Sequence, residues 1–420
     1  MHPTISIDRR LRDRAGRARF PWRRGLQALL LACAGTAVAA DAVDPNTLAR
    51  RPMSMWTQAE REFGFAHWDE LFRARVIARG QAVHALPEAA PLAGFAPGGA
   101  GTKQLQRSVD DFGLAGIVVL HRGQLRLEHY AHGFGTSGRW VSFSLAKSLT
   151  GTLVGAAIKD GFIGSVDDAV TLYIPELQGS VYQGVTLRHL LTMSSGVKWS
   201  DDISDPASDL VLLEQMPVAA GMNAAVSYMK TLRRDAVPGA RWLYNTGESD
   251  LLGVVVSRAT RKTLSDYASE KIWAAYGMES DASWTLDRTG QEHGGSRIQA
   301  GTRDYARFGQ FILEGARING QAVLPDGWLV SATSKQVDIG DPNAGYGYHW
   351  WTRKSGMFNA FGIYGQQIHI DPARRLVVAV NSAAPNADFT KELVAARMAL
   401  FDAIRAAVDA EDSRNASSTP

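Results

Sequence analysis

The chain has 420 residues, of which 45% are hydrophobic and 21% charged, an ordinary composition for a globular protein. This length supports a large core and one or two domains. No run of 18 or more apolar residues follows the N-terminal segment, which excludes an internal membrane span.

Residues 1–40 are expected to be a secretory signal peptide. Residues 1–24 hold eight Arg and two Asp, and residues 25–40 form an uncharged run that ends in an Ala-x-Ala-type cleavage signal. A retained membrane anchor is the alternative, but the run is shorter than the roughly 20 apolar residues of a span. The pair Arg23-Arg24 raises the twin-arginine export route, although its neighbours fit that signal poorly.

Removal of this segment changes what the composition implies. The formal net charge of +3 becomes −3, because eight basic and two acidic residues are lost. A nucleic-acid partner is therefore not expected. The single cysteine, Cys33, is lost as well, which excludes disulfides, a thiol nucleophile and a Cys-ligated metal. We expect a periplasmic or secreted protein without a stable membrane span; lipidation at Cys33 is the alternative, although Leu31 is atypical of a lipoprotein signal.

The first predicted elements are a hairpin and a buried helix. Residues 115–120 and 125–130 are β-prone and flank a turn, which is typical of a hairpin. In residues 144–163 apolar side chains recur every four positions and few charges occur, which predicts a mostly buried helix. Gly161 and Gly164 are expected to end it.

Helical patterns follow in the middle of the chain, at 186–193, 249–258 and 303–315. Strand patterns return at 346–353, 365–370 and 375–381, before a final amphipathic helix over 389–408. Strands at both ends with helices between them predict an α+β fold, with an antiparallel sheet flanked by helices and an all-helical region. The expected layout is one domain over 41–410, a sheet region from about 105–145 and 345–408, a helical insertion over about 165–344, and a disordered tail over 411–420.

Several common catalytic signatures are missing. The sequence has no Gly-x-Ser-x-Gly nucleophile elbow, no His-Glu-x-x-His metal motif and no glycine-rich phosphate loop. His129 and His132 have a spacing open to metal binding, but on a strand they point to opposite faces. No metal and no cofactor are therefore expected.

The strongest chemical signal is Ser144-Leu145-Ala146-Lys147 at the start of the buried helix. Positions i and i+3 share a helix face, so the lysine amine can reach the serine hydroxyl. A base must remove the hydroxyl proton before serine becomes a good nucleophile, and burial favours a neutral lysine. The alternative is a helix-capping serine beside a surface lysine, since Ser-x-x-Lys occurs roughly once or twice by chance in a chain this long.

In this context the sequence resembles serine β-lactamases and penicillin-binding proteins, whose active site begins with Ser-x-x-Lys after an N-terminal hairpin. The class C-type branch is the most similar, through the segments 166–170, 173–177, 189–196, 238–244 and 347–351. Within it the 6-aminohexanoate-dimer hydrolase group is the best match, through the segments 284–287, 303–309 and 362–366.

The resemblance implies roles for individual residues. Ser144 is the expected nucleophile, Lys147 its partner, and Tyr244 the residue that passes a proton to the leaving group. The backbone N–H groups of Ser144 and Ile363 are the expected oxyanion hole. The resemblance also implies contacts with substrate at three positions, Thr246, Gly362 and Tyr364. For Tyr244 the alternative is a core aromatic beside Trp242.

Two departures from the family pattern bear on specificity. The Tyr-x-Asn motif of class C enzymes reads Tyr244-Asn245-Thr246, and the Lys-Thr-Gly motif reads Ala360-Phe361-Gly362. The cation that helps to hold the carboxylate of penicillins and D-Ala-D-Ala peptides is therefore missing. This argues against an efficient β-lactamase or D,D-peptidase.

The expected function is a serine hydrolase that cleaves small-molecule amide or ester substrates through an acyl-enzyme. An esterase or weak β-lactamase on the same site is the nearest alternative. A non-catalytic binding protein for cell-wall fragments is the alternative from another class. The joint presence of Ser144, Lys147 and Tyr244 disfavours that last reading.

Export makes the first testable prediction. Mature protein recovered from the periplasm should begin near Ala40 or Asp41, as read by N-terminal sequencing or intact mass. A chain that starts at Met1, or at a lipidated Cys33, would contradict the signal-peptide interpretation.

Overall fold

The computed structural model describes residues 43–417. The expected signal peptide, with Cys33, lies outside the described residues. No helix among those described is long and apolar enough to cross a membrane.

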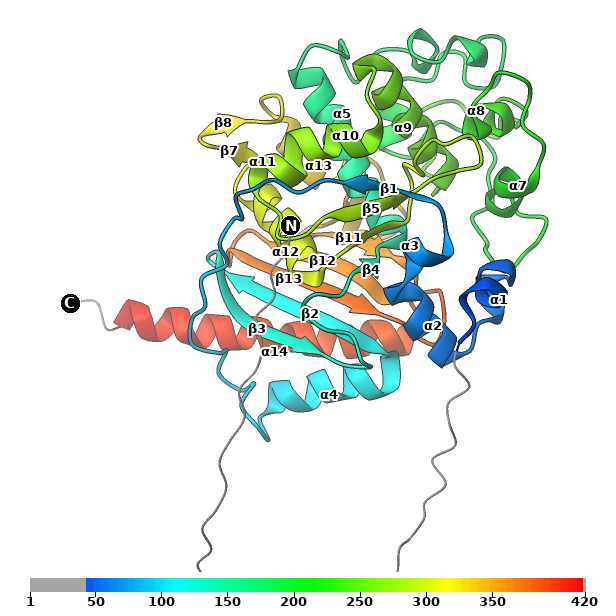
Figure 1. Cartoon of the computed structure of the whole chain (residues 1–420). Helices are drawn as coiled ribbons and strands as arrows, with labels where there is room; N and C mark the ends of the chain where they lie inside the picture. Colours follow the sequence, from blue (N-terminus) through cyan, green and yellow to red (C-terminus); the bar gives the residue numbers. More distant parts are fainter. Residues whose placement is uncertain (1–42, 418–420) are drawn as a thin grey trace, which may run out of the picture. The chain divides into compact units, whose positions relative to one another are not determined.

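The fold is built on a seven-stranded antiparallel sheet with the order β3-β2-β13-β12-β11-β10-β9 (Figure 1). Two distant stretches of the chain supply its strands: β2 (Leu114–His121), β3 (Gln124–Tyr130), β9 (Ala344–Tyr346), β10 (Trp351–Arg353), β11 (Phe358–Gly362), β12 (Gln366–Asp371) and β13 (Leu376–Ser382). The predicted hairpin is confirmed as β2–β3. Arg122 and Gly123 in its turn both have positive φ, as a tight hairpin turn requires.

Two helices, α4 (Ala100–Phe112) and α14 (Lys391–Ser417), pack together across one face of this sheet (Figure 1). Their apolar side chains bury Val119 of β2 and Val378 of β13 in one cluster. The alternate residues of β2, Val118 and Leu120, belong to the larger cluster on the opposite face. The central strands are therefore buried on both sides, which explains their nearly unbroken apolar sequence.

The opposite face carries the helical part of the molecule. Helix α12 (Thr302–Leu313) lies against β2, β12 and β13. Beyond it stand α5 (Ala146–Lys159) and α9 (Thr246–Thr260), which pack on each other (Figure 1). The other α-helices are α1 (Pro45–Arg50), α2 (Gln58–Ala66), α3 (Trp68–Leu71), α6 (Leu187–Leu191), α7 (Asp209–Gln215), α8 (Ala224–Met229), α10 (Leu264–Ala268), α11 (Ala274–Tyr276) and α13 (Trp328–Thr333).

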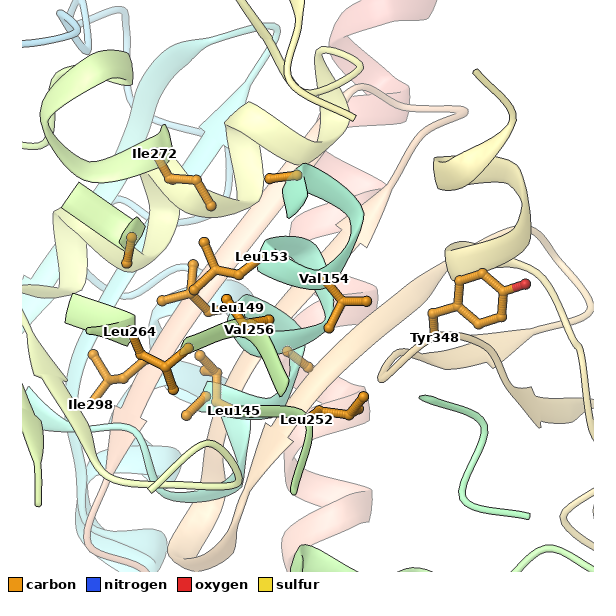
Figure 2. Packing of buried hydrophobic residues seen from close by; sticks show 14 of the residues in the cluster. Leu145, Leu149, Leu153, Val154, Leu252, Val256, Leu264, Ile272, Ile298 and Tyr348 are labelled. Carbon is orange, nitrogen blue, oxygen red and sulfur yellow. The ribbon is translucent and has the colours of Figure 1, made fainter. Parts of the chain in front are cut away.

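Helix α5 is the buried helix predicted from leucine spacing. Leu149 and Leu153 are at most 2% exposed and lie among side chains of α9, α10 and β6, including Val256 and Leu264 (Figure 2). Of the 14 helical residues of α5, 12 are buried, so the helix has almost no solvent face. Packing around the whole helix therefore fixes its position, and with it the position of Lys147.

The α+β fold class is confirmed, but the predicted helical insertion over 165–344 was wrong in one respect. A second sheet, with the order β1-β5-β6-β4, takes two strands from this range. Its strands are β1 (Ala74–Ile77), β4 (Trp140–Val141), β5 (Ala282–Thr285) and β6 (Ile298–Ala300). The two-stranded β7 (Arg317–Ile318) and β8 (Gln321–Ala322) also lie there. Strands of two to four residues are too short to show an alternating pattern.

The predicted disordered tail over 411–420 was also wrong up to Ser417, since α14 continues to that residue. Glu411 accepts two hydrogen bonds, of 3.0 and 2.6 Å, from the Arg126 guanidinium of β3, which is only 5% exposed. Asp412 pairs with Arg122 at 2.9 Å. The acidic residues of this segment form ion pairs with the β2–β3 hairpin. Partners so far apart in the chain produce no periodic pattern, so the sequence did not predict this part of the helix.

Candidate active site

The segment that carries Ser144 is held rigidly between β6 and an aromatic cluster. The Ser142 N–H donates to the Ile298 carbonyl at 2.6 Å, and the Ile298 N–H donates to Ser142 Oγ at 3.0 Å. Phe143 has a φ of +45°, a conformation that is strained for a residue with a side chain. Its ring packs edge-on against Phe65 at 4.9 Å. In the 3-10 turn formed by Phe143–Leu145, Ser144 alone is not buried.

Lys147 lies one turn further along, in the first turn of α5, and is 2% exposed. Its Nζ donates to Ser144 Oγ at 3.0 Å, to Thr246 Oγ1 at 2.9 Å and to the Gly295 carbonyl at 2.8 Å. The predicted contact between Ser144 and Lys147 is therefore present, and the alternative of a surface lysine is excluded. Three acceptors satisfy all three N–H groups of the protonated amine, as burial of such a group requires.

Tyr244 joins the same site. Lys147 Nζ lies 4.8 Å from the centroid of the Tyr244 ring, over its face. The same ring stacks on Trp351, with centroids 5.7 Å apart, and contacts Trp242, with centroids 6.3 Å apart. Because Tyr244 is half-buried and borders Lys147, it is more than a core aromatic beside Trp242. The structure thus brings Ser144, Lys147 and Tyr244 together.

The two residues after Tyr244, Asn245 and Thr246, make different contacts: the first caps a helix and the second bonds Lys147. Asn245 is buried and caps α9, because its side-chain oxygen accepts from the Glu248 N–H at 3.1 Å. Thr246, the first residue of α9, accepts from Lys147. Thr246 was predicted to contact substrate. The structure shows its hydroxyl bonded to Lys147, and the contact with substrate stays a prediction.

Gly362 brings the edge of β11 against the serine segment. A Cβ atom at this position would lie 2.1 Å from the Ser142 carbonyl oxygen, so only glycine fits. Ile363 follows directly, and its carbonyl accepts from Gln366 Nε2 at 3.1 Å. The proximity of β11 to the serine segment fits the expected role of the Ile363 N–H in an oxyanion hole, which stays a prediction.

Tyr364 does not occupy the position predicted for it. Its side chain is 3% exposed and packs against Phe65 and Phe143, with ring centroids 5.2 and 5.8 Å away. A ring so enclosed has no surface for a ligand. Tyr364 instead supports the turn after β11, in left-handed conformation with a φ of +58°, and backs the serine segment through Phe143.

Three aromatic side chains, Phe361, Trp351 and Trp242, lie where the family pattern places a cation; we call them the aromatic wall. Ala360 is 1% exposed, while Phe361 is half-buried and contacts Trp351 at 6.0 Å between ring centroids. Trp351 in turn contacts Trp242 at 5.6 Å. Trp242 also lines an open groove of about 520 Å³, whose other walls are residues 239–241 and 336–340. The surroundings of Tyr244 are therefore apolar and aromatic on the β10–β11 side.

Two buried titratable groups beside the site are held neutral. Burial, and then the neighbouring Lys147 cation, lower the pKa of His349 to about 3. Its Nε2 is 3.0 Å from Ser249 Oγ. Burial raises the pKa of the Glu248 carboxyl to about 8. At neutral pH His349 therefore adds no second positive charge next to Lys147.

Sequence reasoning assigned no role to Gly295, to His349 or to Asp201, which accepts from Thr246 Oγ1 at 2.8 Å. Gly295 holds its position because a Cβ would lie 2.7 Å from Thr246 Cγ2, and the Gly294-Gly295 pair was the one visible signal for it. Asp201 had no distinguishing pattern in the sequence. His349 lies in the segment 347–351, which resembles the family, but that resemblance assigned it no role. Among residues 43–417, no group of three or more His, Cys, Asp or Glu side chains is arranged to hold a metal ion.

The fold and the Ser-Lys-Tyr arrangement define the class of serine hydrolases to which β-lactamases belong. The family model for Beta-lactamase matches residues 103–401, and the chain belongs to that family. The sequence is 28% identical to the 6-aminohexanoate-dimer hydrolase of Paenarthrobacter ureafaciens over 365 residues, which cover 82% of this chain and 91% of that protein.

Solved structures show the same fold. A candidate 6-aminohexanoate-dimer hydrolase from Bacillus anthracis superposes with a TM-score of 0.73 at 24% identity, covering 89% of this chain and 98% of that one. A penicillin-binding protein homologue from Caulobacter crescentus gives a TM-score of 0.58 at 16% identity, covering 76% of this chain and 99% of that one. The predicted resemblance to this superfamily is confirmed.

Proposed function

We propose that the protein is a serine hydrolase that cleaves amide or ester bonds of small molecules through an acyl-enzyme intermediate. The observation that carries this proposal is the 3.0 Å contact between Lys147 Nζ and Ser144 Oγ inside a buried, fully hydrogen-bonded setting. The 6-aminohexanoate-dimer hydrolase relative supports a linear amide among the substrates.

In acylation, Lys147 takes the hydroxyl proton and Ser144 Oγ attacks the substrate carbonyl carbon. The backbone N–H groups of Ser144 and Ile363 stabilise the developing oxyanion. Tyr244, beside Lys147, returns a proton to the leaving amine or alkoxide. Water then attacks the acyl-enzyme, and the same groups act in reverse to release the acid and restore the Ser144 hydroxyl.

The aromatic wall favours substrates without a carboxylate next to the scissile bond. No basic residue occurs on β11, where Phe358–Gly362 reads Phe-Asn-Ala-Phe-Gly. A β-lactam carboxylate placed there would give up solvation and gain no charged partner. A short-chain ester or a linear amide loses nothing at this position. An esterase or amidase therefore fits the site better than a β-lactamase.

The nucleophile is tested by Ser144→Ala. Turnover of p-nitrophenyl butyrate and of 6-aminohexanoate dimer should fall below a few per cent of wild type. Within residues 43–417, the only other hydroxyl that contacts Lys147 Nζ is that of Thr246. The fold should be intact, since a serine at a helix start contributes only about 1 kcal/mol. Ser137→Ala, at an exposed position, is the matched control. Full activity in Ser144→Ala would refute the assignment.

Specificity is tested with the purified mature enzyme. The missing charge-assisted hydrogen bond is worth roughly 1.5–3 kcal/mol, or about ten- to a hundredfold in transition-state binding. We expect kcat/KM to be higher on p-nitrophenyl acetate or butyrate than on nitrocefin by at least the lower of these factors. A large preference for nitrocefin would show that another residue supplies the cation and would place the protein among the true β-lactamases.

A further inference from the structure

A chain of three side chains leads from the active site to a carboxylate with no assigned role. Lys147 Nζ donates to Thr246 Oγ1 at 2.9 Å, and Thr246 Oγ1 donates to Asp201 Oδ2 at 2.8 Å. An ionised carboxylate only accepts hydrogen bonds, so the single hydroxyl proton of Thr246 must point at Asp201. Thr246 can then offer Lys147 nothing but a lone pair.

The carboxylate itself is firmly placed. Asp201 Oδ1 accepts from the Trp199 indole N–H at 2.7 Å and from the Thr246 backbone N–H at 3.3 Å. The second of these is a free N–H at the start of α9, where negative charge is favoured. Asp201 thus has one oxygen occupied by two N–H donors and the other facing the Thr246 hydroxyl.

The remaining partner of Lys147 is also an acceptor only. The Gly295 carbonyl takes a hydrogen bond from Nζ at 2.8 Å, and the Gly295 N–H is held by Asp250 Oδ1, also at 2.8 Å. When Lys147 gives up the proton that its ammonium form donates to Ser144 Oγ, the neutral amine keeps two N–H groups and one lone pair. With Thr246 and Gly295 both restricted to accepting, the two N–H groups are committed to them, and the lone pair faces Ser144 Oγ, 3.0 Å away.

We infer that Asp201 is a positioning residue that, by fixing the hydroxyl proton of Thr246, aims the lone pair of Lys147 at Ser144. This inference rests on the proposed function, because it concerns the step in which Lys147 takes the serine proton. It also explains how Thr246 can stand where class C enzymes have asparagine. An amide carbonyl is an acceptor by nature, whereas a hydroxyl accepts from lysine only if its own proton is occupied elsewhere.

The near-isosteric variant Asp201→Asn tests the direction of this hydrogen-bond chain. The amide oxygen will take the position that faces two N–H donors, which turns the amide NH₂ toward Thr246 Oγ1. Thr246 then accepts from residue 201, and its proton rotates toward Lys147. The lysine lone pair would be occupied by Thr246, and an N–H group would face Ser144 in its place.

The experiment measures phosphonylation of Ser144 by a fluorophosphonate probe. Intact-mass spectrometry follows the rate, and peptide mapping identifies the labelled residue. We expect Asp201→Asn to lower the maximal labelling rate constant kinact about 10- to 100-fold with KI unchanged, the effect of one misdirected charge-assisted hydrogen bond. Asp202→Asn is the matched control, because that exposed neighbour accepts hydrogen bonds from Ser204 and not from Thr246. An unchanged thermal unfolding midpoint checks the fold.

A double-variant cycle separates this role from simple packing. Thr246→Val removes the hydroxyl that Asp201 acts on, so Asp201→Asn should lower kinact by less than about twofold in that background. Multiplied losses in the double variant, or wild-type kinact in Asp201→Asn, would overturn the inference while leaving the proposed function intact. Failure of wild-type protein to be labelled at Ser144 would instead overturn the proposed function, and this inference with it.

Discussion

The burial of the Lys147 amine is the constraint on which the active site depends. An ammonium group that is 2% exposed is tolerable only when each of its N–H groups meets an acceptor. Those acceptors come from three parts of the chain: the serine turn, the start of α9, and the loop before β6. The hydrogen bonds of Lys147 Nζ therefore connect α5 to segments that are 99 and 148 residues away in the sequence.

Each segment is in turn fixed by the surrounding fold. Helix α5 is clamped by the leucine and valine cluster shown in Figure 2, which leaves Lys147 little freedom to move. The Gly294-Gly295 pair lets the loop approach α9, since a Cβ at Gly294 would lie 2.4 Å from the Ser249 carbonyl oxygen. Gly362 allows the C-terminal end of β11 to reach the serine segment. Rigid support of this kind is what a preorganised catalytic site requires.

Much of this arrangement was predictable because its signals are local. The spacing of Ser144 and Lys147 on one helix face follows from helix geometry, and leucine periodicity correctly predicted the burial of α5. The β2–β3 hairpin and the α+β class were also predictable from strand patterns and their order. In each case the physical cause lies within a few residues of the signal.

Apart from the short strands of the second sheet, the features that escaped prediction depend on contacts between distant residues. Asp201 acts on Thr246, 45 positions away, and Gly295 on Lys147, 148 positions away. Glu411 orders the end of α14 through Arg126, 285 positions away. The family resemblance assigned Tyr364 to substrate binding, but its ring packs against Phe65 and Phe143. A single sequence carries no mark of such pairings.

The proposed mechanism requires Lys147 to be the group that activates Ser144. Lys147→Met keeps the length and apolar stem of the side chain and removes the amine, so the helix should stay folded. General-base catalysis is worth about 10²–10⁴-fold, and we expect the rate of fluorophosphonate labelling at Ser144, measured by intact mass at neutral pH, to fall by a factor in this range. Labelling of Lys147→Met at close to the wild-type rate would contradict the account.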